Sequence, residues 1–289
     1  MTSHNSLKTK VYILYHANCF DGTGAKYAAW KHFGDDATYI PVQYGQPFPD
    51  EVVLNNLTIV NILDFSYSRE ILEEVNAKVG LLQVLDHHKT AQAALAGLDY
   101  ATFDMERSGA VMAWNYFFPG KEVPRLLKHV QDRDLWKFEL TNTKRITAAL
   151  PLLEGSMLLW EQACVNDAYF DELVVQGDAI LNSDKLKISS IVKHNVKVLP
   201  YKGYKAGVYN TTTLISEVGN EACKSVELGI DFSMSYFIDK EGTPILSFRS
   251  LGDFDVSVLA KELGGGGHKN ASGSKVTFQF LTDLYQGIL

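Results

Sequence analysis

Imidazole and carboxylate side chains stand directly after three apolar runs in the first third of the chain. These residues are His16, Asp64 and Asp86, and they follow Val11–Tyr15, Leu57–Leu63 and Leu81–Leu85. Side by side they would form a dense negative cluster, which is costly unless cations neutralise it. Mixed imidazole and carboxylate ligands suit manganese, iron or zinc, whereas calcium and magnesium sites rely on oxygen alone. The pattern therefore predicts a metal site, although the adjacent His87 and His88 taken alone would also fit a solvated loop.

The elements around these residues indicate how they come together. A helix-like stretch follows the first run at Gly22–Phe33, and a second follows the next run at Arg69–Lys78. Strands that are apolar on both faces and alternate with helices are typical of a parallel α/β sheet. The carboxyl ends of parallel strands meet at one edge, where such folds place their ligands. We therefore expect an α/β fold with the three polar residues at that edge.

A second chemical signal lies near the end of the chain, between the helix-like Val256–Leu263 and an expected strand. Its residues with potential for anion binding are Gly265, Gly266, Gly267, His268, Asn270 and Ser272. Consecutive glycines let backbone N–H groups approach an anion, and the polar side chains can donate hydrogen bonds to it. Arg249 ends an upstream strand and is either a solvated edge charge or a bidentate phosphate contact. The segment predicts a phosphate-binding element, with a flexible linker as the alternative.

The middle of the chain is helical and the last third is rich in strands. Helical patterns cover Gly109–Phe118, Pro124–Val130 and Met157–Ile191, whereas strands are expected at Phe232–Ile238 and Ile245–Phe248. A turn at residues 240–243 indicates that the two strands form a hairpin. Ser108 could cap the first of these helices or help to bind an anion. We predict two domains, 1–190 and 191–289.

Composition excludes several classes of protein. The 289 residues are 46% hydrophobic and 21% charged, which is typical of a folded chain. The net charge of −7 disfavours binding of a long duplex nucleic acid through a broad basic surface. Three scattered cysteines form no disulfide framework, and no stretch reaches the roughly 18 apolar residues of a membrane span. Because Met1–Lys10 is polar as well, we expect a cytoplasmic protein and no membrane partner.

These motifs together resemble the DHH phosphoesterases that carry a DHH-associated C-terminal domain. The likeness rests on Tyr15–Gly22, on Asp64, on Asp86–His88 and on the glycine–histidine run at 264–268. They stand in the family's order over nearly the whole chain, and the first fragment looks most like its small oligoribonuclease or cyclic-nucleotide phosphodiesterase branch. The resemblance implies a parallel-sheet DHH domain and a smaller α/β substrate-binding domain, with the active site in the cleft between them. It also implies two divalent ions, manganese above all, with magnesium as an alternative, and a water or hydroxide nucleophile that bridges them.

The resemblance also implies a role for each matched residue. His16 and Asp21 would be metal ligands, Asp64 would bridge both metals and His87 would bind the second one. Asp86 would orient the site, and His88 would face the scissile phosphate or the leaving group.

The family's fourth motif supplies a further aspartate, for which the segment Gln131–Trp136 is the candidate. Asp132 and Asp134 are two positions apart and cannot share a helical face, so we expect one to be a ligand and the other not. We assign Asp132 as the ligand, with a surface charge cluster as the alternative.

Cys19 departs from the family's pattern, because many relatives place an aspartate at this position. It is either a thiolate ligand, which is softer than a carboxylate, or a buried cysteine beside a metal with an open position. Both interpretations stay open.

The leading hypothesis is hydrolysis of short single-stranded oligonucleotides of the nanoRNA type or of small nucleotide phosphodiesters. A cyclic (di)nucleotide or a 3′,5′-bisphosphate nucleotide is an alternative substrate, and a homodimer is compatible with the sequence. A nucleotide sensor without catalysis would not need the full ligand set. A pyrophosphatase or polyphosphatase would carry a Lys- and Arg-rich second domain in place of the element at 264–272.

Overall fold

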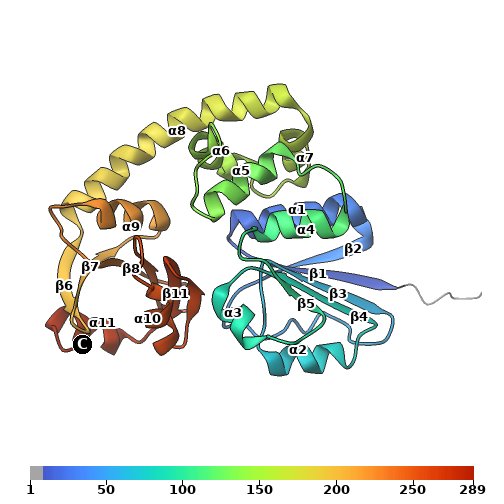
Figure 1. Ribbon diagram of the computed structural model, residues 1–289, viewed down its shortest axis with the longest axis horizontal. Helices are drawn as coiled ribbons and strands as arrows, with labels where there is room; N and C mark the ends of the chain where they lie inside the picture. Colours follow the sequence, from blue (N-terminus) through green and yellow to red (C-terminus); the bar gives the residue numbers. More distant parts are fainter. Residues whose placement is uncertain (1–8) are drawn as a thin grey trace, which may run out of the picture. The chain divides into compact units, whose positions relative to one another are not determined.

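The computed structural model describes residues 9–289, which form two compact units that divide between Leu181 and Asn182 (Figure 1). Most of the polar segment Met1–Lys10, on which the expectation of a cytoplasmic protein rests in part, lies outside the described residues. The division between the units falls within the long helix α8, Asp167–His194. Each unit has a sheet and a hydrophobic core of its own.

The first unit is built on a five-stranded sheet in which every pair is parallel. Its strands are β1 Lys10–His16, β2 Ala37–Val42, β3 Thr58–Leu63, β4 Leu81–Asp86 and β5 Ala101–Phe103, in the order β2-β1-β3-β4-β5. Tyr15 pairs with Leu63, and Leu63 pairs with Leu85. The residues that follow these pairs therefore stand level with one another. The prediction of a parallel α/β sheet is confirmed.

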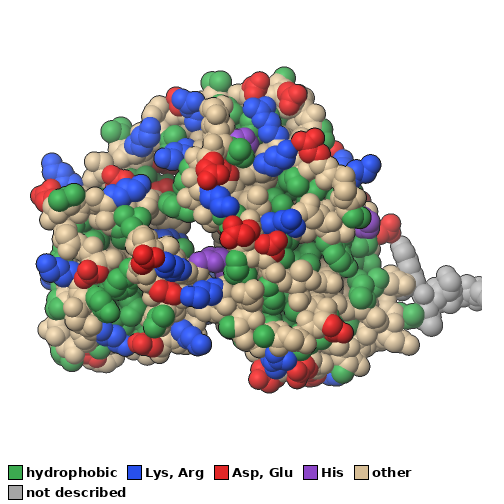
Figure 2. All heavy atoms as spheres, in the orientation of Figure 1, with side chains coloured by type: hydrophobic (Ala, Val, Ile, Leu, Met, Phe, Trp, Pro, Cys, Tyr) green, Lys and Arg blue, Asp and Glu red, His purple; other side chains and the backbone are tan. Residues whose placement is uncertain are grey.

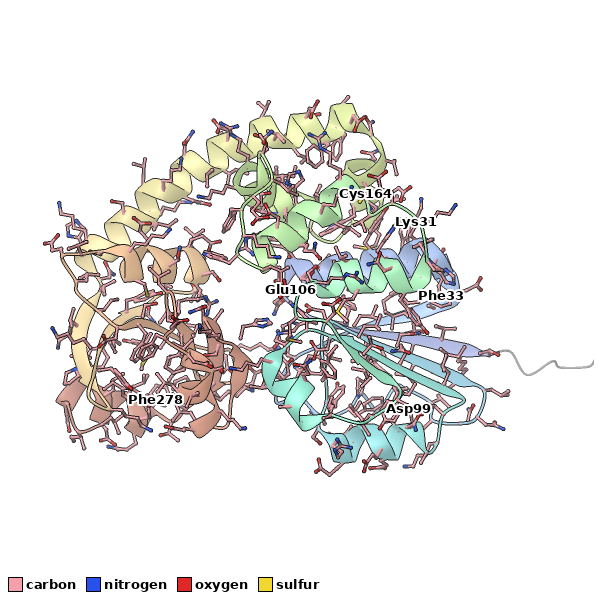
Figure 3. The ribbon with its side chains drawn as sticks, viewed as in Figure 1. Lys31, Phe33, Asp99, Glu106, Cys164 and Phe278 are labelled. Carbon is pink, nitrogen blue, oxygen red and sulfur yellow. The ribbon has the colours of Figure 1, made fainter. Side chains whose placement is uncertain are left out.

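Helices cover both faces of this sheet (Figure 1). One face carries α1 Phe20–Phe33 and α4 Gly109–Phe117, and the other carries α2 Arg69–Asn76, with α3 Lys89–Ala94 after β4. A Cβ at Gly24 would lie 2.8 Å from the Cβ of Ala110, so a glycine is needed where α1 and α4 pack together. Figure 3 shows Phe33 at the C-terminal end of α1. A short 3₁₀ helix, Gly34–Asp36, leads from there into β2.

A helical layer packs on α1 and α4. It consists of α5 Arg125–Asp134, α6 Thr143–Ala149, the 3₁₀ helix Leu150–Leu153, α7 Met157–Val165 and the first part of α8. Trp160 and Phe170 are each 1% exposed and join these helices to the core. Among residues 9–289, no helix is both long enough and apolar enough to cross a membrane.

The second unit has a six-stranded mixed sheet in the order β10-β11-β9-β8-β7-β6. Its elements are β6 Lys197–Tyr201, β7 Tyr204–Asn210, α9 Ile215–Lys224, β8 Phe232–Ile238, β9 Pro244–Arg249, α10 Val256–Glu262, β10 Gly266–His268, β11 Ala271–Lys275 and α11 Phe278–Gln286. The hairpin of β8 and β9 agrees with the sequence prediction. Asp239 closes its turn, since its side chain accepts a 2.7 Å hydrogen bond from the backbone N–H of Thr243. On the face shown in Figure 2, Lys and Arg side chains are interspersed with Asp and Glu.

Candidate metal centre

Asp64 lies directly after β3, in the interior of the first unit. Its backbone is left-handed, with φ of 56°, and its N–H donates a 2.8 Å hydrogen bond to the carbonyl of Leu85. Aspartate tolerates this conformation better than most residues. The side chain of Asp64 is 1% exposed. A Cβ added at Gly109 would lie only 2.4 Å from the Cβ of Asp64. Gly109 therefore allows α4 to begin directly against this carboxylate.

Asp21 is held in the first turn of α1 by the start of α4. Its Oδ2 accepts a hydrogen bond of 2.5 Å from the N–H of Gly109, and its Oδ1 accepts one of 3.0 Å from Ala110. Ser108 caps α4 by accepting from the N–H of Val111, which confirms the capping prediction. A helix N-terminus stabilises negative charge. The start of α4 therefore positions a carboxylate that is 2% exposed.

The His87 ring lies between three carboxylates after the end of β4. Its Nε2 is 3.1 Å from Asp64 Oδ1, 3.5 Å from Asp21 Oδ2 and 3.4 Å from Asp134 Oδ2. Burial acts to lower the pKa of His87, but the hydrogen bond to Asp64 and the charge of Asp134 outweigh it and raise the pKa to about 10. The negative charge of the three carboxylates raises the pKa of His87 because it attracts a proton. The same negative charge attracts a metal cation, which competes with protons for these side chains.

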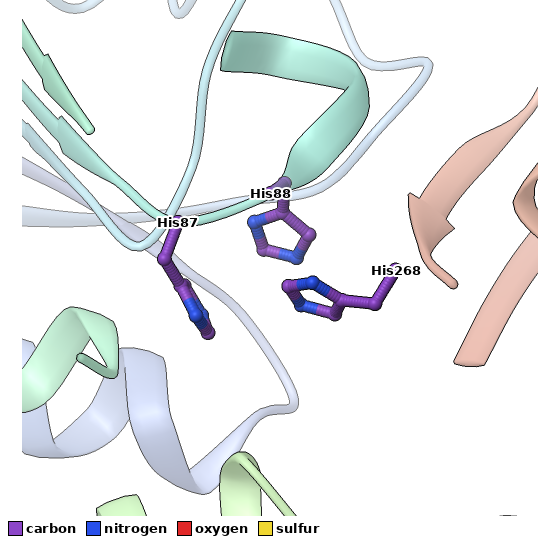
Figure 4. Close-up of side chains that lie close together, drawn as sticks. All are labelled: His87, His88 and His268. Atoms are coloured by element: carbon purple, nitrogen blue, oxygen red, sulfur yellow. The ribbon is translucent and has the colours of Figure 1, made fainter. Parts of the chain in front are cut away.

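Asp86 organises the two histidines that follow it. Its Oδ1 accepts hydrogen bonds from the backbone N–H groups of His87 and His88, at 2.7 and 3.2 Å, and lies 2.6 Å from Nδ1 of His88. Its Oδ2 accepts a 2.5 Å hydrogen bond from Ser66. Burial acts to raise the pKa of Asp86, but His88 and Ser66 hold it below its usual value. Figure 4 shows the His87 and His88 rings where β4 ends and α3 begins.

Oδ2 of Asp64, Oδ2 of Asp134 and Nδ1 of His16 are among the buried polar atoms of this cluster that have no hydrogen-bond partner among the described residues. Asp64 Oδ2 lies 3.4 Å from His16 Nδ1, and Asp134 Oδ2 lies 3.4 Å from His87 Nε2. Leaving such atoms unpaired is costly, and charged groups cost the most. Burial and the charge of Asp64 raise the pKa of Asp134, and burial together with Asp64 and Asp134 raises that of Asp21. The donor set therefore fits divalent cations.

The ligand atoms fall into sets whose members lie within 4.8 Å of one another. One set is His16, Cys19 and Asp64, and another is Asp21, His87 and Asp134. Five of these six residues were singled out in the sequence as metal ligands. The structure brings them to the carboxyl edge of the sheet, where the parallel topology predicts them to be.

Asp134 is the member that sequence reasoning did not select. Asp132 turns its carboxylate to the loop after α5, where it accepts hydrogen bonds from the N–H groups of Glu139 and Leu140, at 2.9 and 3.0 Å, and from Thr143, at 2.5 Å. Burial acts to raise the pKa of Asp132, but these donors lower it. This geometry does not agree with our choice of Asp132 as a ligand.

Cys19 lies at the start of α1, half-buried and beside His16 and Asp64. A Cβ at Gly22 would lie 2.1 Å from the carbonyl oxygen of His16, so glycine is needed where α1 turns back over the end of β1. Burial raises the pKa of the Cys19 thiol, and the charges of Asp64 and Asp134 raise it further. A nearby cation would reverse that effect of charge.

Tyr44 also borders the centre and was not identified from the sequence. Its ring centroid lies 5.6 Å from that of His16, 5.8 Å from that of His88 and 4.5 Å from that of Phe65. The side chain is still 46% exposed. No motif surrounds this residue, which follows β2, so only the folded chain reveals it.

In the second unit, Arg249 lies at the end of β9 and is held by local partners. Its Nη2 donates to the hydroxyl of Ser216 at 2.8 Å, and its Nη1 donates to the carbonyl of Phe248 at 2.7 Å. A Cβ at Gly219 would lie 2.7 Å from Cγ of Arg249, so α9 packs directly on this side chain. The arginine is therefore fixed in one orientation.

The glycine run is part of the sheet. Gly266–His268 pairs with β11, and Gly267 has a φ of 137°. A Cβ at Gly265 would lie 2.0 Å from the carbonyl oxygen of Gly273. These glycines therefore have a packing reason that is independent of any anion.

Asn270 and Ser272 direct their donors to groups of the same unit. The amide of Asn270 donates to the hydroxyl of Ser250 at 2.9 Å and to the carbonyl of Gly252 at 3.2 Å. The hydroxyl of Ser272 donates to the carbonyl of Val256 at 2.8 Å. This geometry gives both residues a structural role and does not support a phosphate contact.

Comparison with known proteins finds two relatives that align over most of this chain. The chain is 33% identical over 284 residues to Uncharacterized protein R106 of Acanthamoeba polyphaga mimivirus. The aligned region covers 90% of this chain and 66% of the viral protein. It is 24% identical over 302 residues to oligoribonuclease NrnB of Bacillus subtilis, which covers 92% of this chain and 73% of NrnB. This similarity supports a DHH-like phosphoesterase. The chain thus spans about two thirds of the first relative and somewhat more of the second.

No family model matches the sequence. A solved structure of the pGpG-specific phosphodiesterase PggH from Vibrio cholerae aligns with a TM-score of 0.49 and 12% identity, over 96% of each chain.

Proposed function

We propose that this chain is a metal-dependent phosphodiesterase that hydrolyses short oligonucleotides or small nucleotide phosphodiesters. The observation that carries the proposal is the pair of buried oxygens, on Asp64 and Asp134, that have no hydrogen-bond partner among the described residues. They lie beside His16 and His87 at the carboxyl edge of a parallel sheet. The similarity to oligoribonuclease NrnB supports the same chemistry.

Two divalent cations would have separate ligand sets in this proposal. One set is His16, Asp64 and Cys19, and the other is Asp21, His87 and Asp134, with Asp64 able to serve both through its two oxygens. Manganese fits this mixture of imidazole and carboxylate. When bound, the cations supply an activated water and neutralise charge that develops at phosphorus.

His88 is the residue proposed to act on the phosphate ester itself. Nδ1 of His88 lies 2.6 Å from Oδ1 of Asp86, and the ring stands directly after β4, beside His87. Burial acts to lower the pKa of His88, but the charge of Asp86 and the hydrogen bond to it raise the pKa. The raised pKa favours the protonated ring, which in this proposal would donate its proton to a phosphate or leaving-group oxygen. Asp86 fixes the orientation of the ring.

The second unit is proposed to bind the phosphate or nucleoside portion of the substrate. Arg249, His268 and the backbone at 265–267 are the candidates, since Asn270 and Ser272 use their donors within the unit. Arg249 is pre-oriented by Ser216, so its ordering would cost little when a phosphate binds.

One assay tests this function. The purified full chain is freed of metal by chelation and then supplied with manganese or magnesium. Dinucleotides, longer oligomers, cyclic dinucleotides, 3′,5′-bisphosphates and pyrophosphate serve as substrates, and the products are separated by chromatography. We expect no hydrolysis in excess chelator, recovery that is better with manganese, and the fastest turnover on a short nucleotide diester.

A variant identifies the centre. His87→Ala should lose bound metal and turnover together, because its ring lies among three carboxylates. Full activity in excess chelator, or unchanged metal content in this variant, would contradict the proposal. Cleavage of pyrophosphate alone would replace it with a pyrophosphatase.

A further inference from the structure

The first unit has a pocket on the side remote from the candidate metal centre. It lies beside the C-terminal end of α1 and beside β3. It has a volume of about 380 Å³ and is lined by the last turn of α1, the last turn of α4 and the first part of β3. Asp21 begins α1 at the metal centre, whereas His32 and Phe33 end it at the pocket. A helix of this length spans about 20 Å, so the two sites share elements but not residues. We refer to it as the α1–α4 pocket.

Asn61 is the buried one of three lining residues with polar side chains, the others being His32 and Tyr116. It lies in the middle of β3, is 1% exposed, and its Oδ1 is buried without a hydrogen-bond partner among the described residues. Its same-face neighbours do not satisfy it. Ile13 is apolar, and the amide of Gln83 donates to the carbonyl of Val84 and to Thr102.

The other buried residues of β3 are mainly apolar. An asparagine among them lowers the stability of the folded chain unless its amide is hydrogen-bonded. An unpaired buried amide oxygen destabilises the folded chain. A ligand that brings an N–H donor into the pocket would remove that destabilisation.

Aromatic rings form the walls. The centroid of His32 lies 5.4 Å from that of Phe117, and Phe33 lies 5.5 Å from Phe117 with the two rings nearly perpendicular. Tyr116 continues the wall at 5.1 Å from Phe117 and is 41% exposed, so it borders the mouth. None of the lining residues is Lys, Arg, Asp or Glu.

We propose that the α1–α4 pocket binds an uncharged planar heterocycle with an N–H donor on its edge, such as the base of a nucleoside. Flat rings gain from contact with aromatic walls, and asparagine amides pair well with the edges of bases. The absence of lysine and arginine from the lining means that a phosphate adds nothing to binding here. The pocket therefore accepts the base and not the charged part of a nucleotide, and this inference does not depend on the hydrolytic activity.

Equilibrium dialysis of the full chain against adenosine, guanosine, cytidine and uridine tests the proposal, with the 5′-monophosphate of each as a second probe. We expect saturable binding of at least one nucleoside. Its affinity should be equal within about threefold to that of its monophosphate and unaffected by chelator, because binding at the metal centre would require the phosphate.

Two variants assign the site. Asn61→Leu should weaken nucleoside binding roughly three- to tenfold through loss of one hydrogen bond, without lowering the melting temperature, because leucine leaves no buried amide unpaired. Tyr116→Ala should weaken it roughly five- to a hundredfold through loss of a stacking wall, and its exposed position spares the fold. His88→Ala is the matched control and should keep the affinity.

The inference is overturned by any of three results. These are no nucleoside binding at millimolar concentration, binding that both pocket variants keep, or binding that is lost in His88→Ala or in chelator. The second result would assign the Asn61 oxygen to a buried water. None of them bears on whether the metal centre hydrolyses phosphodiesters, which is measured separately.

Discussion

The carboxyl edge of the parallel sheet and the glycine-rich hairpin of β10 and β11 differ in whether their polar side chains have hydrogen-bond partners within the chain. At the sheet edge, buried oxygens of Asp64 and Asp134 have no hydrogen-bond partner among residues 9–289. In the hairpin region, Asn270 and Ser272 donate to groups of their own unit. Buried charge without hydrogen bonds destabilises a fold, and hydrogen-bonded polar groups stabilise it. The first pattern is therefore expected of residues that bind a ligand, and the second of residues that stabilise the structure.

Asp132 and Asp134, two positions apart in α5, show the same difference. The carboxylate of Asp132 accepts three hydrogen bonds, whereas Oδ2 of Asp134 has no hydrogen-bond partner among the described residues. Asp134→Asn should lose metal and at least about a hundredfold in turnover, with stability in chelator unchanged or higher, because a buried charge is removed. Asp132→Asn should keep its metal but lose roughly 1–3 kcal/mol of unfolding free energy, because its oxygens serve Glu139, Leu140 and Thr143. Metal content and denaturant unfolding measured on both variants decide the matter. The reverse pattern would restore Asp132 as the ligand.

His268 tests whether the hairpin contributes to substrate binding at all. His268→Ala should reduce kcat/KM on nucleotide substrates by roughly ten- to a hundredfold, which is the effect of one hydrogen bond to a charged group, and should leave metal content unchanged. A small chromogenic diester that does not use this contact should be cleaved at nearly the parental rate. Equal losses on both substrates would place His268 in the chemical step, and no loss on either would make the hairpin purely structural.

Ser272 tests the structural side of the comparison. Ser272→Ala removes the hydrogen bond to the carbonyl of Val256 in a position that is 6% exposed. We expect a loss of about 1–2 kcal/mol in unfolding free energy and a change of less than about twofold in kcat/KM on nucleotide substrates. Thermal unfolding and steady-state kinetics measure the two effects. A tenfold kinetic loss at unchanged stability would return Ser272 to the phosphate site.

His129 extends the closed network around Asp132 and gives it a pH dependence. Thr143 donates its hydroxyl proton to Asp132, so Nδ1 of His129 carries the proton in the 2.8 Å contact with Thr143. Burial lowers the pKa of His129 to about 4 from its usual 6.5. The unfolded chain then binds a proton that the folded chain does not, and the stability from this residue is present above pH 6.5 and lost as the pH falls toward 4. Urea unfolding at pH 7.5 and 5.5 should show a smaller difference in His129→Gln than in the parent, and an equal difference would contradict this assignment.

Much of the metal centre follows from the sequence because parallel strands impose it. His16, Asp64 and Asp86 each end an apolar run, and the register that pairs Tyr15, Leu63 and Leu85 makes them neighbours whatever the loops do. The α/β fold follows from the same alternation of apolar runs and helices. The hairpin of β8 and β9 follows from local turn chemistry at Asp239.

What the sequence by itself determined was therefore the fold class and which strand ends carry the candidate ligands, because periodicity and strand direction are local properties. Only the tertiary structure shows that Asp134 lies beside His87 whereas Asp132 is hydrogen-bonded to the segment after α5. The partners of Asp132 lie seven to eleven positions later, in a loop that Trp136 and Phe138 turn through left-handed conformations. Likewise the roles of Asn270 and Ser272 depend on carbonyls 16 to 18 positions away. Hydrogen-bond partners at such separations depend on how segments pack in the folded chain, so residue spacing in the sequence does not predict them.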